Sequence, residues 1–280
     1  MCKIFEYEKI KTLKIKPNCN ETFLAYKNTT KEKVIVKQYY SINQYSKISF
    51  QRDKNININH FLINKLIEYF ENENSLFVVR QFIEGQNINE LAKKIKSKNK
   101  IDFVLNFIRK VGECLKILHN NGIIHRDIRP SNIICDKSDN FVLIDFSSSL
   151  VPKLDNIDTY KTFSLIYSPP EQVLNYKHLI NESSDIYALG ISSWILLTDN
   201  IPFKHKIPEL IANLQLNLPL PKIKKIPSNL QNIIDKCTYK IPFNKPPKFC
   251  NYEQIEQLII NGQQNRYPNV DELLDDIKKL

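Results

Sequence analysis

The feature that most constrains the fold is a change of pattern about a third of the way along the chain. Short runs rich in β-branched residues come first, and the clearest of them, residues 33–39 and 75–82, predict strands. Over residues 101–118, apolar side chains recur every three or four positions, which indicates a helix with one buried face. A chain of 280 residues is long enough for two lobes. We therefore expect an α+β fold with a β-rich lobe over residues 1–83 and a larger, mainly helical lobe over residues 84–280.

Weaker signals fill in the remaining elements. A polar stretch near residues 44–58 has a helical pattern, and Gly122 suits the left-handed cap that ends the helix before it. Further strands are expected at residues 132–135 and 141–144, a buried helix at residues 185–197, and a last helix beginning at a capping box on Asn269. Residues 239–265 are less regular and read as a surface insertion that contains a short helix.

Composition narrows the class of protein. The net charge is +10, but lysines are spread along the whole chain, so we expect no nucleic-acid partner. Uninterrupted apolar stretches are too short for a membrane span, and the first residues are too charged for a signal peptide. Six scattered cysteines without metal-ligand spacing favour reduced thiols. We therefore expect a cytoplasmic protein.

The most specific chemical signal lies near the middle of the chain. Asp127 follows His125 and Arg126, Asn132 comes five positions later, and further on an apolar run ends in Asp145. The pattern resembles the catalytic loop H-R-D-x-x-x-x-N and the D-F-G motif of the protein kinase superfamily, and the resemblance extends over nearly the whole chain.

The resemblance implies a two-lobed kinase fold and a reaction. The protein would transfer the γ-phosphoryl of ATP to Ser or Thr hydroxyls of a protein substrate, with Mg²⁺ as cofactor. Asp127 would orient and deprotonate the acceptor hydroxyl, with Arg129 beside it, and Asn132 and Asp145 would hold the metal. Lys37, at the end of a β-branched run, would pair with the nucleotide phosphates. The other expected nucleotide-binding residues are Ile15, Thr22, Ile35, Gln81, Ile83 and Ile134.

Other family marks follow in order along the chain. Pro170 and Glu171 resemble the end of the activation segment, and Arg266 stands where the family places the partner of this glutamate. Asp185 resembles the aspartate that braces the backbone of the catalytic loop. Ser164 stands where Ser/Thr kinases keep a threonine that contacts the catalytic aspartate. His125 is expected in the core, while Arg126 would receive a phosphate carried by Thr159 or Thr162.

The match departs from the family mainly in the first lobe. The stretch 15–22, which should cover the phosphates, has no glycine, and Pro17 within it lacks an N–H donor. The acidic partner of Lys37 is open between Asp53 and Gln51. Arg80 falls at the position that gates the back of the nucleotide pocket. In the second lobe, Arg129 replaces the usual lysine, and Ser147 replaces the glycine of D-F-G.

Two alternatives to an active Ser/Thr kinase remain open. The departures in the first lobe favour a pseudokinase that acts as a scaffold or allosteric partner. A small-molecule kinase is disfavoured, because such relatives generally lack the motifs around Glu171 and Asp185. The loop after Asp127 resembles the Ser/Thr form and not the Tyr-specific form.

Overall fold

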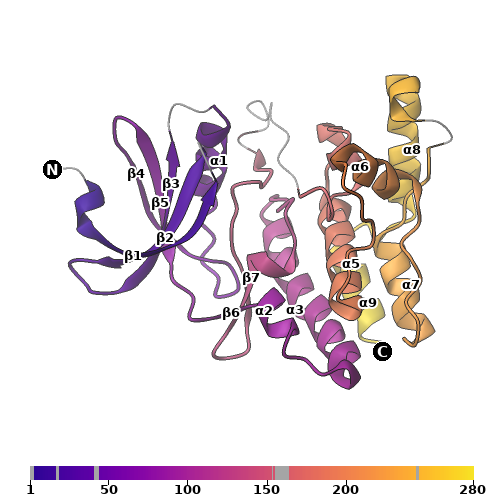
Figure 1. The fold of residues 1–280 in the computed structure, drawn as a ribbon, viewed down its shortest axis with the longest axis horizontal. Coiled ribbons are helices and arrows are strands. Elements are labelled where there is room, and N and C mark those ends of the chain that lie inside the picture. The colour runs from indigo at the N-terminus through magenta and orange to yellow at the C-terminus, as the bar shows by residue number, and fades with distance from the viewer. Residues whose placement is uncertain (1–2, 17–18, 41–43, 153, 155–163, 244–245) are drawn as a thin grey trace. The chain divides into compact units, whose positions relative to one another are not determined.

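A computed structural model describes residues 3–16, 19–40, 44–152, 154, 164–243 and 246–280 (Figure 1). The contacts divide the chain into two compact units. The first comprises Met1–Gln86 and Ile134–Tyr160, and the second Asn87–Ile133 and Lys161–Leu280. The expected lobe boundary between residues 83 and 84 stays a prediction, but the structure groups residues after 133 with the first unit.

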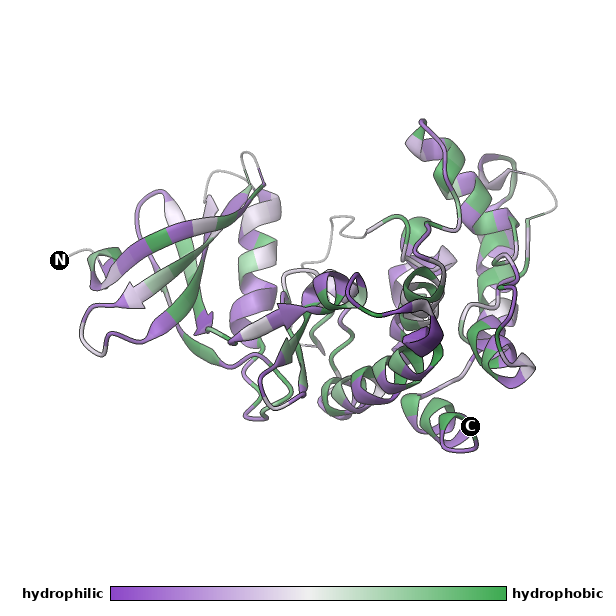
Figure 2. Cartoon of the chain, turned by 60° about the horizontal axis from the view of Figure 1, so that its bottom comes forward, coloured by the Kyte–Doolittle hydropathy of each residue, from purple (hydrophilic) through white to green (hydrophobic). Residues whose placement is uncertain are grey.

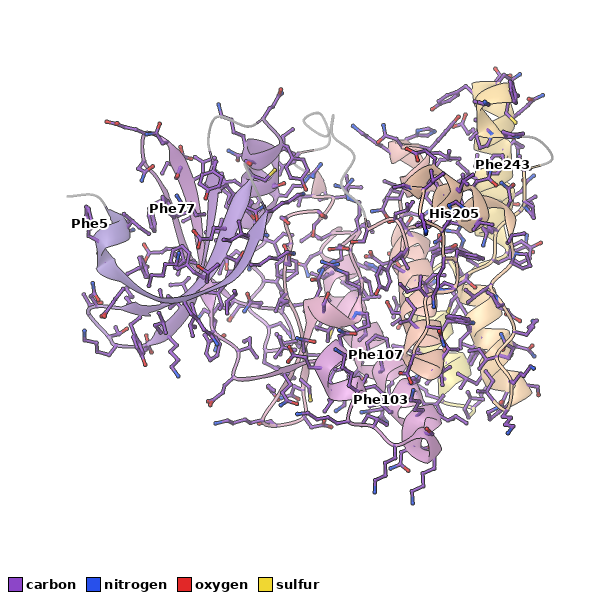
Figure 3. The ribbon with its side chains drawn as sticks, in the orientation of Figure 1. Phe5, Phe77, Phe103, Phe107, His205 and Phe243 are labelled. Carbon is purple, nitrogen blue, oxygen red and sulfur yellow. The ribbon has the colours of Figure 1, made fainter. Side chains whose placement is uncertain are left out.

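An antiparallel sheet of order β1-β2-β3-β5-β4 forms the first unit together with one helix. Its inner side is lined by buried residues such as Val36, Phe77 and Val79, and Figure 3 labels Phe77 on this sheet. Helix α1 packs against β3, β4 and β5. The elements are β1 (Tyr7–Lys16), β2 (Asn20–Lys27), β3 (Lys33–Tyr40), α1 (Gln44–Asn55), β4 (Leu66–Glu71) and β5 (Ser75–Gln81).

A second, smaller sheet has the strand order β6-β7-β8. Its strands are β6 (Gly85–Asn87), β7 (Ile133–Asp136) and β8 (Phe141–Leu143). Gly85 is required where β6 approaches β7, because a Cβ there would lie only 2.0 Å from the carbonyl oxygen of Cys135. Backbone bonds from Asn64 to Leu143 and from Leu143 to Leu62 tie β8 to the first unit.

The second unit is mainly helical, and the sequence explains why. Helix α3 buries the apolar positions that recur every three or four residues, and Gly122 follows it with φ 70°, as expected. Helix α5 is buried along most of its length. In Figure 2 the green, hydrophobic residues alternate with purple ones around the helices of this unit. The helices are α2 (Ile88–Ala92), α3 (Lys100–Asn120), α4 (Pro170–Val173), α5 (Glu182–Thr198), α6 (Pro208–Asn217), α7 (Ser228–Cys237), α8 (Tyr252–Gln264) and α9 (Val270–Ile277).

The expectation of a surface insertion at residues 239–265 is wrong. Helix α8 runs from Tyr252 to Gln264, and its Ile255 and Ile259 are buried in a cluster with Phe243 and Val173. Asn251 caps this helix by accepting a bond from the backbone N–H of Gln254. The short helix expected in this segment is confirmed, and its buried face contributes to the core of the second unit. Among the described residues, no helix is both long and apolar enough to cross a membrane.

A buried ion pair joins α4 to the connection between α8 and α9. Arg266 Nη1 lies 2.7 Å from Glu171 Oε1, with both side chains almost fully buried, and Ser184 Oγ donates to the same carboxylate oxygen. The expected pairing of Glu171 with Arg266 is thus confirmed. Lys240 lies close by, also buried, with its ammonium over the rings of Tyr187 and Phe203.

Burial, and after it the positive charge of Arg266, lowers the pKa of Lys240 from 10.5 to about 8. At pH 7 the lysine is charged in both the folded and the unfolded states. Desolvation of this ammonium then costs the folded state roughly 3 kcal/mol, of which the two ring contacts recover a part. Between about pH 8 and 10.5 the unfolded state binds more protons than the folded state, so the contribution of this lysine to stability improves as pH rises.

We predict that Lys240→Met raises the free energy of unfolding at pH 7 by about 1–3 kcal/mol, because the apolar stem stays packed without a buried charge. The gain should shrink between pH 8 and 10, where the wild-type lysine loses its proton. Urea denaturation at several pH values measures both effects. Lys248→Met, at an exposed position, is the control and should change little. A gain that is the same at pH 7 and pH 10 would contradict the assignment of the cost to the buried charge.

Candidate active site

The catalytic-loop segment of the second unit is fixed by a buried carboxylate. Asp185, on α5, is fully buried and accepts bonds from the backbone N–H groups of His125 and Arg126, each at 2.8 Å. It also lies 3.0 Å from His119 Nε2. The expected bracing by Asp185 is confirmed. It holds Arg126 at φ 63°, a left-handed conformation that costs a non-glycine residue about 1–2 kcal/mol.

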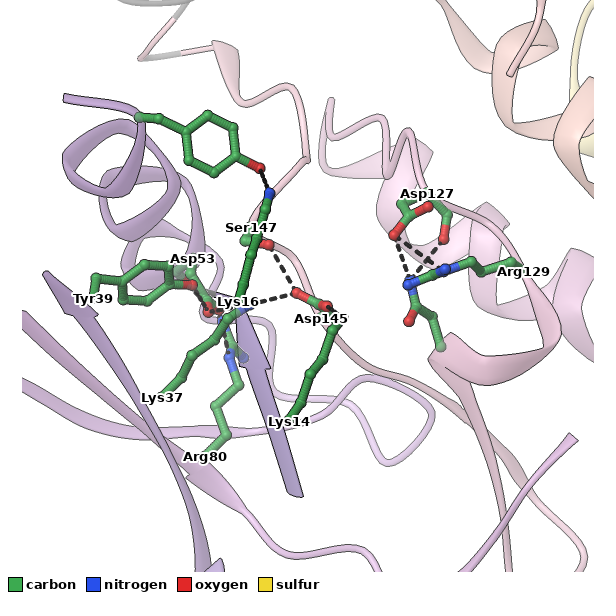
Figure 4. A network of polar contacts seen from close by, with 12 residues as sticks. Lys14, Lys16, Lys37, Tyr39, Asp53, Arg80, Asp127, Arg129, Asp145 and Ser147 are labelled. Atoms are coloured by element: carbon green, nitrogen blue, oxygen red, sulfur yellow. Dashed lines mark hydrogen bonds and ion pairs between the residues drawn. The ribbon is translucent and has the colours of Figure 1, made fainter. Parts of the chain in front are cut away.

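Asp127 follows this braced turn, and three side chains converge on it. Figure 4 shows one of them, Arg129, beside Asp127. Asn132 Nδ2 donates to Asp127 Oδ2 at 2.8 Å and to its backbone oxygen at 3.0 Å. Ser164 Oγ donates to Asp127 Oδ1 at 2.6 Å, which confirms the expected contact. Arg129 Nε lies 3.4 Å from Oδ2. Both carboxylate oxygens are therefore oriented by fixed donors within the second unit.

A second cluster lies in the first unit around Asp145. Lys37 Nζ donates to Asp145 Oδ1 at 2.6 Å, and Ser147 Oγ donates to the same oxygen at 2.8 Å (Figure 4). Lys14 Nζ, from β1, is 3.9 Å from the other oxygen. The backbone of Asp145 is also left-handed, with φ 65°.

Charge keeps this aspartate ionised. Burial alone would raise the pKa of Asp145, but the ammonium groups of Lys37 and Lys14 and the bonds from Lys37 and Ser147 hold that pKa well below its usual range. The pKa of Lys37 is also subject to opposing effects. Burial lowers this pKa, but the charges of Asp145 and Asp53 outweigh burial, so the pKa is raised. The pair is a permanent carboxylate facing a permanent cation.

The structure answers the open question about the acidic partner of Lys37. Asp53, on α1, lies 4.0 Å from Lys37 Nζ, which is an ion pair beyond hydrogen-bond distance. Its own short contacts are with Tyr39 Oη at 2.7 Å and Arg80 Nε at 2.8 Å. Asp53 is thus near Lys37, but its closest cation is Arg80.

The strand register shows which of the residues expected to bind a nucleotide share one face of the sheet. Thr22 lies opposite Lys14 on one side and opposite Lys37 on the other, so these three form one row across β1, β2 and β3. Ile35 shares that face, two positions before Lys37 and opposite Arg80. The others are placed singly: Ile15 is exposed on β1, Gln81 is exposed at the end of β5, and Ile83 and Ile134 are half-buried.

The donor set fits a hard cation. Asp145 offers an ionised carboxylate that is partly exposed. Asn132 uses its amide nitrogen on Asp127, which leaves the amide oxygen as the atom suited to a metal. Asp145 belongs to the first unit and Asn132 to the second.

Some expectations fall outside the described residues. Thr159 and Thr162 are among these, and so is Pro17 in the stretch that lacks glycine. Arg126, which is expected to bind a phosphate on Thr159 or Thr162, is itself buried. His125 is fully buried, as expected of a core residue.

Sequence reasoning missed three contacts. The bond from Ser147 to Asp145 could have been found, because a hydroxyl two residues after a carboxylate is a common local donor. The arginine in the apolar run of β5 was also a signal, since a buried guanidinium needs a partner. The third contact is the short distance between Lys14 and Asp145. It depends on the register of β1 against β2, which shifts at two points, and the sequence does not predict those shifts.

Comparisons with known proteins agree with this geometry. The serine/threonine-protein kinase PrkC of Bacillus subtilis is 30% identical over 209 residues, which cover 72% of this chain and 31% of that protein. The serine/threonine-protein kinase D of Synechocystis is 30% identical over 217 residues, covering 74% of this chain and 40% of that protein. The probable serine/threonine-protein kinase PknB of Lactococcus lactis is 25% identical over 213 residues, 74% of this chain and 30% of that protein.

The chain thus matches about a third of the length of these curated relatives. The family model described as the protein kinase domain matches residues 14–251, a span that includes both the Asp127 cluster and the Asp145 cluster. The chain belongs to the protein kinase domain family.

Proposed function

We propose that this protein transfers the γ-phosphoryl of ATP to Ser or Thr hydroxyls of protein substrates. The observation that carries the proposal is the environment of Asp127, whose two carboxylate oxygens are held by Ser164, Asn132 and Arg129. The relatives named as serine/threonine-protein kinases support the same acceptor class. We also propose a cytoplasmic location, because scattered cysteines without metal-ligand spacing are typical of proteins in a reducing compartment.

Asp127 acts on the acceptor hydroxyl. Its carboxylate accepts the hydroxyl proton as the oxygen attacks phosphorus, and the bond between the γ-phosphorus and the bridging oxygen breaks, so that ADP leaves. The bond from Ser164 and the bond from Asn132 keep the carboxylate in one rotamer, which lowers the entropy cost of the correct approach. Arg129, close to the same carboxylate, adds a positive charge where negative charge moves.

Asp145 and Asn132 are the proposed ligands of Mg²⁺, and Lys37 the proposed partner of the nucleotide phosphates. The metal, when bound, would neutralise charge on the transferred phosphoryl group. Lys37 keeps its positive charge because Asp145 and Asp53 lie next to it. Thr22 and Ile35, which share the sheet face with Lys37, are proposed to contact the nucleotide, and so are Ile15, Gln81, Ile83 and Ile134.

A second candidate is a pseudokinase that acts as a scaffold. It is favoured by the ion pairing of Lys37, whose nearest carboxylate is Asp145 at 2.6 Å and not Asp53 on α1 at 4.0 Å. It is also favoured by the stretch 15–22, which has no glycine. The retained Asp127 cluster argues for the active enzyme.

We predict that Asp127→Asn lowers turnover by about 10²–10⁴-fold, since an amide cannot accept the proton. Asp145→Ala should abolish Mg²⁺-dependent turnover, because it removes the proposed metal carboxylate. Incorporation of labelled phosphate from ATP into generic protein substrates measures both. Phosphoamino-acid analysis should yield phosphoserine and phosphothreonine.

The control is Asp102→Asn, an equally conservative change at an exposed site on α3, which should leave turnover unchanged. Wild-type turnover by either Asp127→Asn or Asp145→Ala would refute the assigned roles. Mainly phosphotyrosine in the products would refute the acceptor class.

We also predict weak nucleotide binding by the wild-type protein. A stretch without glycine offers fewer close N–H donors to phosphate. Each charge-assisted bond lost is worth about 1.5–3 kcal/mol, so one or two lost bonds reduce affinity roughly 10–10³-fold. Lys14 should offset part of this loss from its place in the row with Thr22 and Lys37. Because Lys14 is largely exposed, we expect Lys14→Met to weaken Mg·ATP binding only about three- to fivefold.

Isothermal titration calorimetry with Mg·ATP, Mg·ADP and adenosine measures these affinities. The loss on Lys14→Met should be seen with the two nucleotides and not with adenosine. Lys11→Met, on the same strand, is the matched control. Low-micromolar binding of Mg·ATP would contradict the expected weak affinity, and no binding at millimolar nucleotide would favour the pseudokinase.

A further inference from the structure

One buried arginine in the first unit has more contacts than the proposed reaction requires. Arg80, on β5, is 5% exposed, although the other side chains of this strand up to residue 80 are apolar except for its first serine. A buried guanidinium is costly unless its donors are satisfied. The contacts of Arg80 show what the chain gains from it.

Four hydrogen bonds leave this guanidinium. Nε donates to the Asp53 carboxylate at 2.8 Å, and Nη2 donates to the backbone oxygens of Asp53 at 2.6 Å and Ile56 at 3.1 Å. Nη1 donates to the backbone oxygen of Asn64 at 2.6 Å. The first three bonds end at the last turn of α1 and the residue just beyond it, where helix carbonyls lack partners within the helix. Arg80 therefore caps the C-terminal end of α1 from a neighbouring strand.

The same guanidinium also contacts the residue that follows Asp145. Arg80 Cζ lies 4.7 Å from the centre of the Phe146 ring, and that ring is fully buried. A planar cation over an aromatic face is attracted by the ring's quadrupole. One side chain thus joins the end of α1, the segment 56–64 and Phe146 (Figure 4 shows Arg80 with Asp53).

The distances show why Lys37 does not hold the end of α1 in place of Arg80. Lys37 Nζ lies 2.6 Å from Asp145 but 4.0 Å from Asp53, so its close contact is with the proposed metal ligand. Asp53 is one methylene shorter than a glutamate would be, and its buried charge is balanced at hydrogen-bond distance by Arg80. Asp53 is therefore hydrogen-bonded to the sheet through Arg80 and Tyr39.

We propose that Arg80 is a positioning residue for phosphotransfer: its guanidinium clamps the C-terminal end of α1 and Phe146, and so fixes the position of Asp145. This inference rests on the proposed function. A lysine could keep the charge at this site but could not reproduce bonds to a carboxylate and three carbonyl oxygens, which need the planar fork of arginine.

The test uses two variants, one that keeps the positive charge at position 80 and one that removes it together with the charge of Asp53. Arg80→Lys keeps a cation for Asp53 and loses the fork, while the double variant Arg80→Met with Asp53→Asn removes both charges and so leaves no unpaired buried charge. Phosphate transfer is measured at varied Mg·ATP, and hydrogen exchange is measured across residues 53–64 in the full chain. We expect kcat to fall about 10–10²-fold in both variants, with a smaller change in KM for ATP, because misplacement of a catalytic group acts on the transition state.

Matched controls separate positioning from stability. Arg52→Met removes an equally buried arginine one residue before Asp53. Its melting temperature is measured beside that of the Arg80 variants, and its kcat should stay near the wild-type value. Asp53→Asn alone is the reference for the double variant. If the double variant fails to fold, Arg80→Lys still decides the matter through kcat and exchange.

The outcomes are distinct. Faster exchange across residues 53–64 together with a reduced kcat supports the clamp. Wild-type exchange and kcat in Arg80→Lys, or a double variant as active as Asp53→Asn, overturns it. A wild-type protein that folds but shows no phosphate transfer counts against the proposed function, and the exchange measurement then still reports on the contacts of Arg80.

Discussion

The second unit depends on a carboxylate that has no access to solvent. Asp185 is held in the apolar helix α5, where an unpaired charge would be very costly. Its bonds to the backbone N–H groups of His125 and Arg126 remove that cost, and they fix the one turn whose left-handed backbone precedes Asp127. The same two hydrogen bonds therefore stabilise the second unit and position Asp127, so loss of the Asp185 carboxylate affects both.

The first unit contains charges of both signs away from solvent, and these have to be compensated within the unit. Two ion pairs do so: Lys37 contacts Asp145, and Arg80 contacts Asp53. Each carboxylate also accepts a hydroxyl bond, from Ser147 or from Tyr39. Because every charge has both an ion-pair partner and a hydrogen bond, the arrangement avoids the unpaired buried charge that destabilises folded proteins most.

Much of the fold could be read from the sequence, because the strand and helix patterns are local. The contacts of Asp127 with Ser164, of Asp185 with the backbone and of Glu171 with Arg266 could be read from motif order. The packing of Ile255 and Ile259 could not, since an amphipathic helix shows that it buries a face but not against what. The same limit applied to Asp53, whose choice between Lys37 and Arg80 depends on distances of 4.0 and 2.8 Å that no spacing rule fixes.

The discontinuity of the first unit has a consequence for synthesis on the ribosome. Residues Met1–Gln86 emerge first, yet their unit is completed only by Ile134–Tyr160, which supply Asp145, Phe146 and the strand bonded to Leu62 and Asn64. A chain elongates at roughly 5–20 residues per second, so the sheet waits for several seconds with Lys37 lacking its nearest carboxylate and Arg80 lacking its aromatic partner. During that interval the interior of the first unit is incomplete, and the groups that Ile134–Tyr160 later contact are open to solvent and to chaperones.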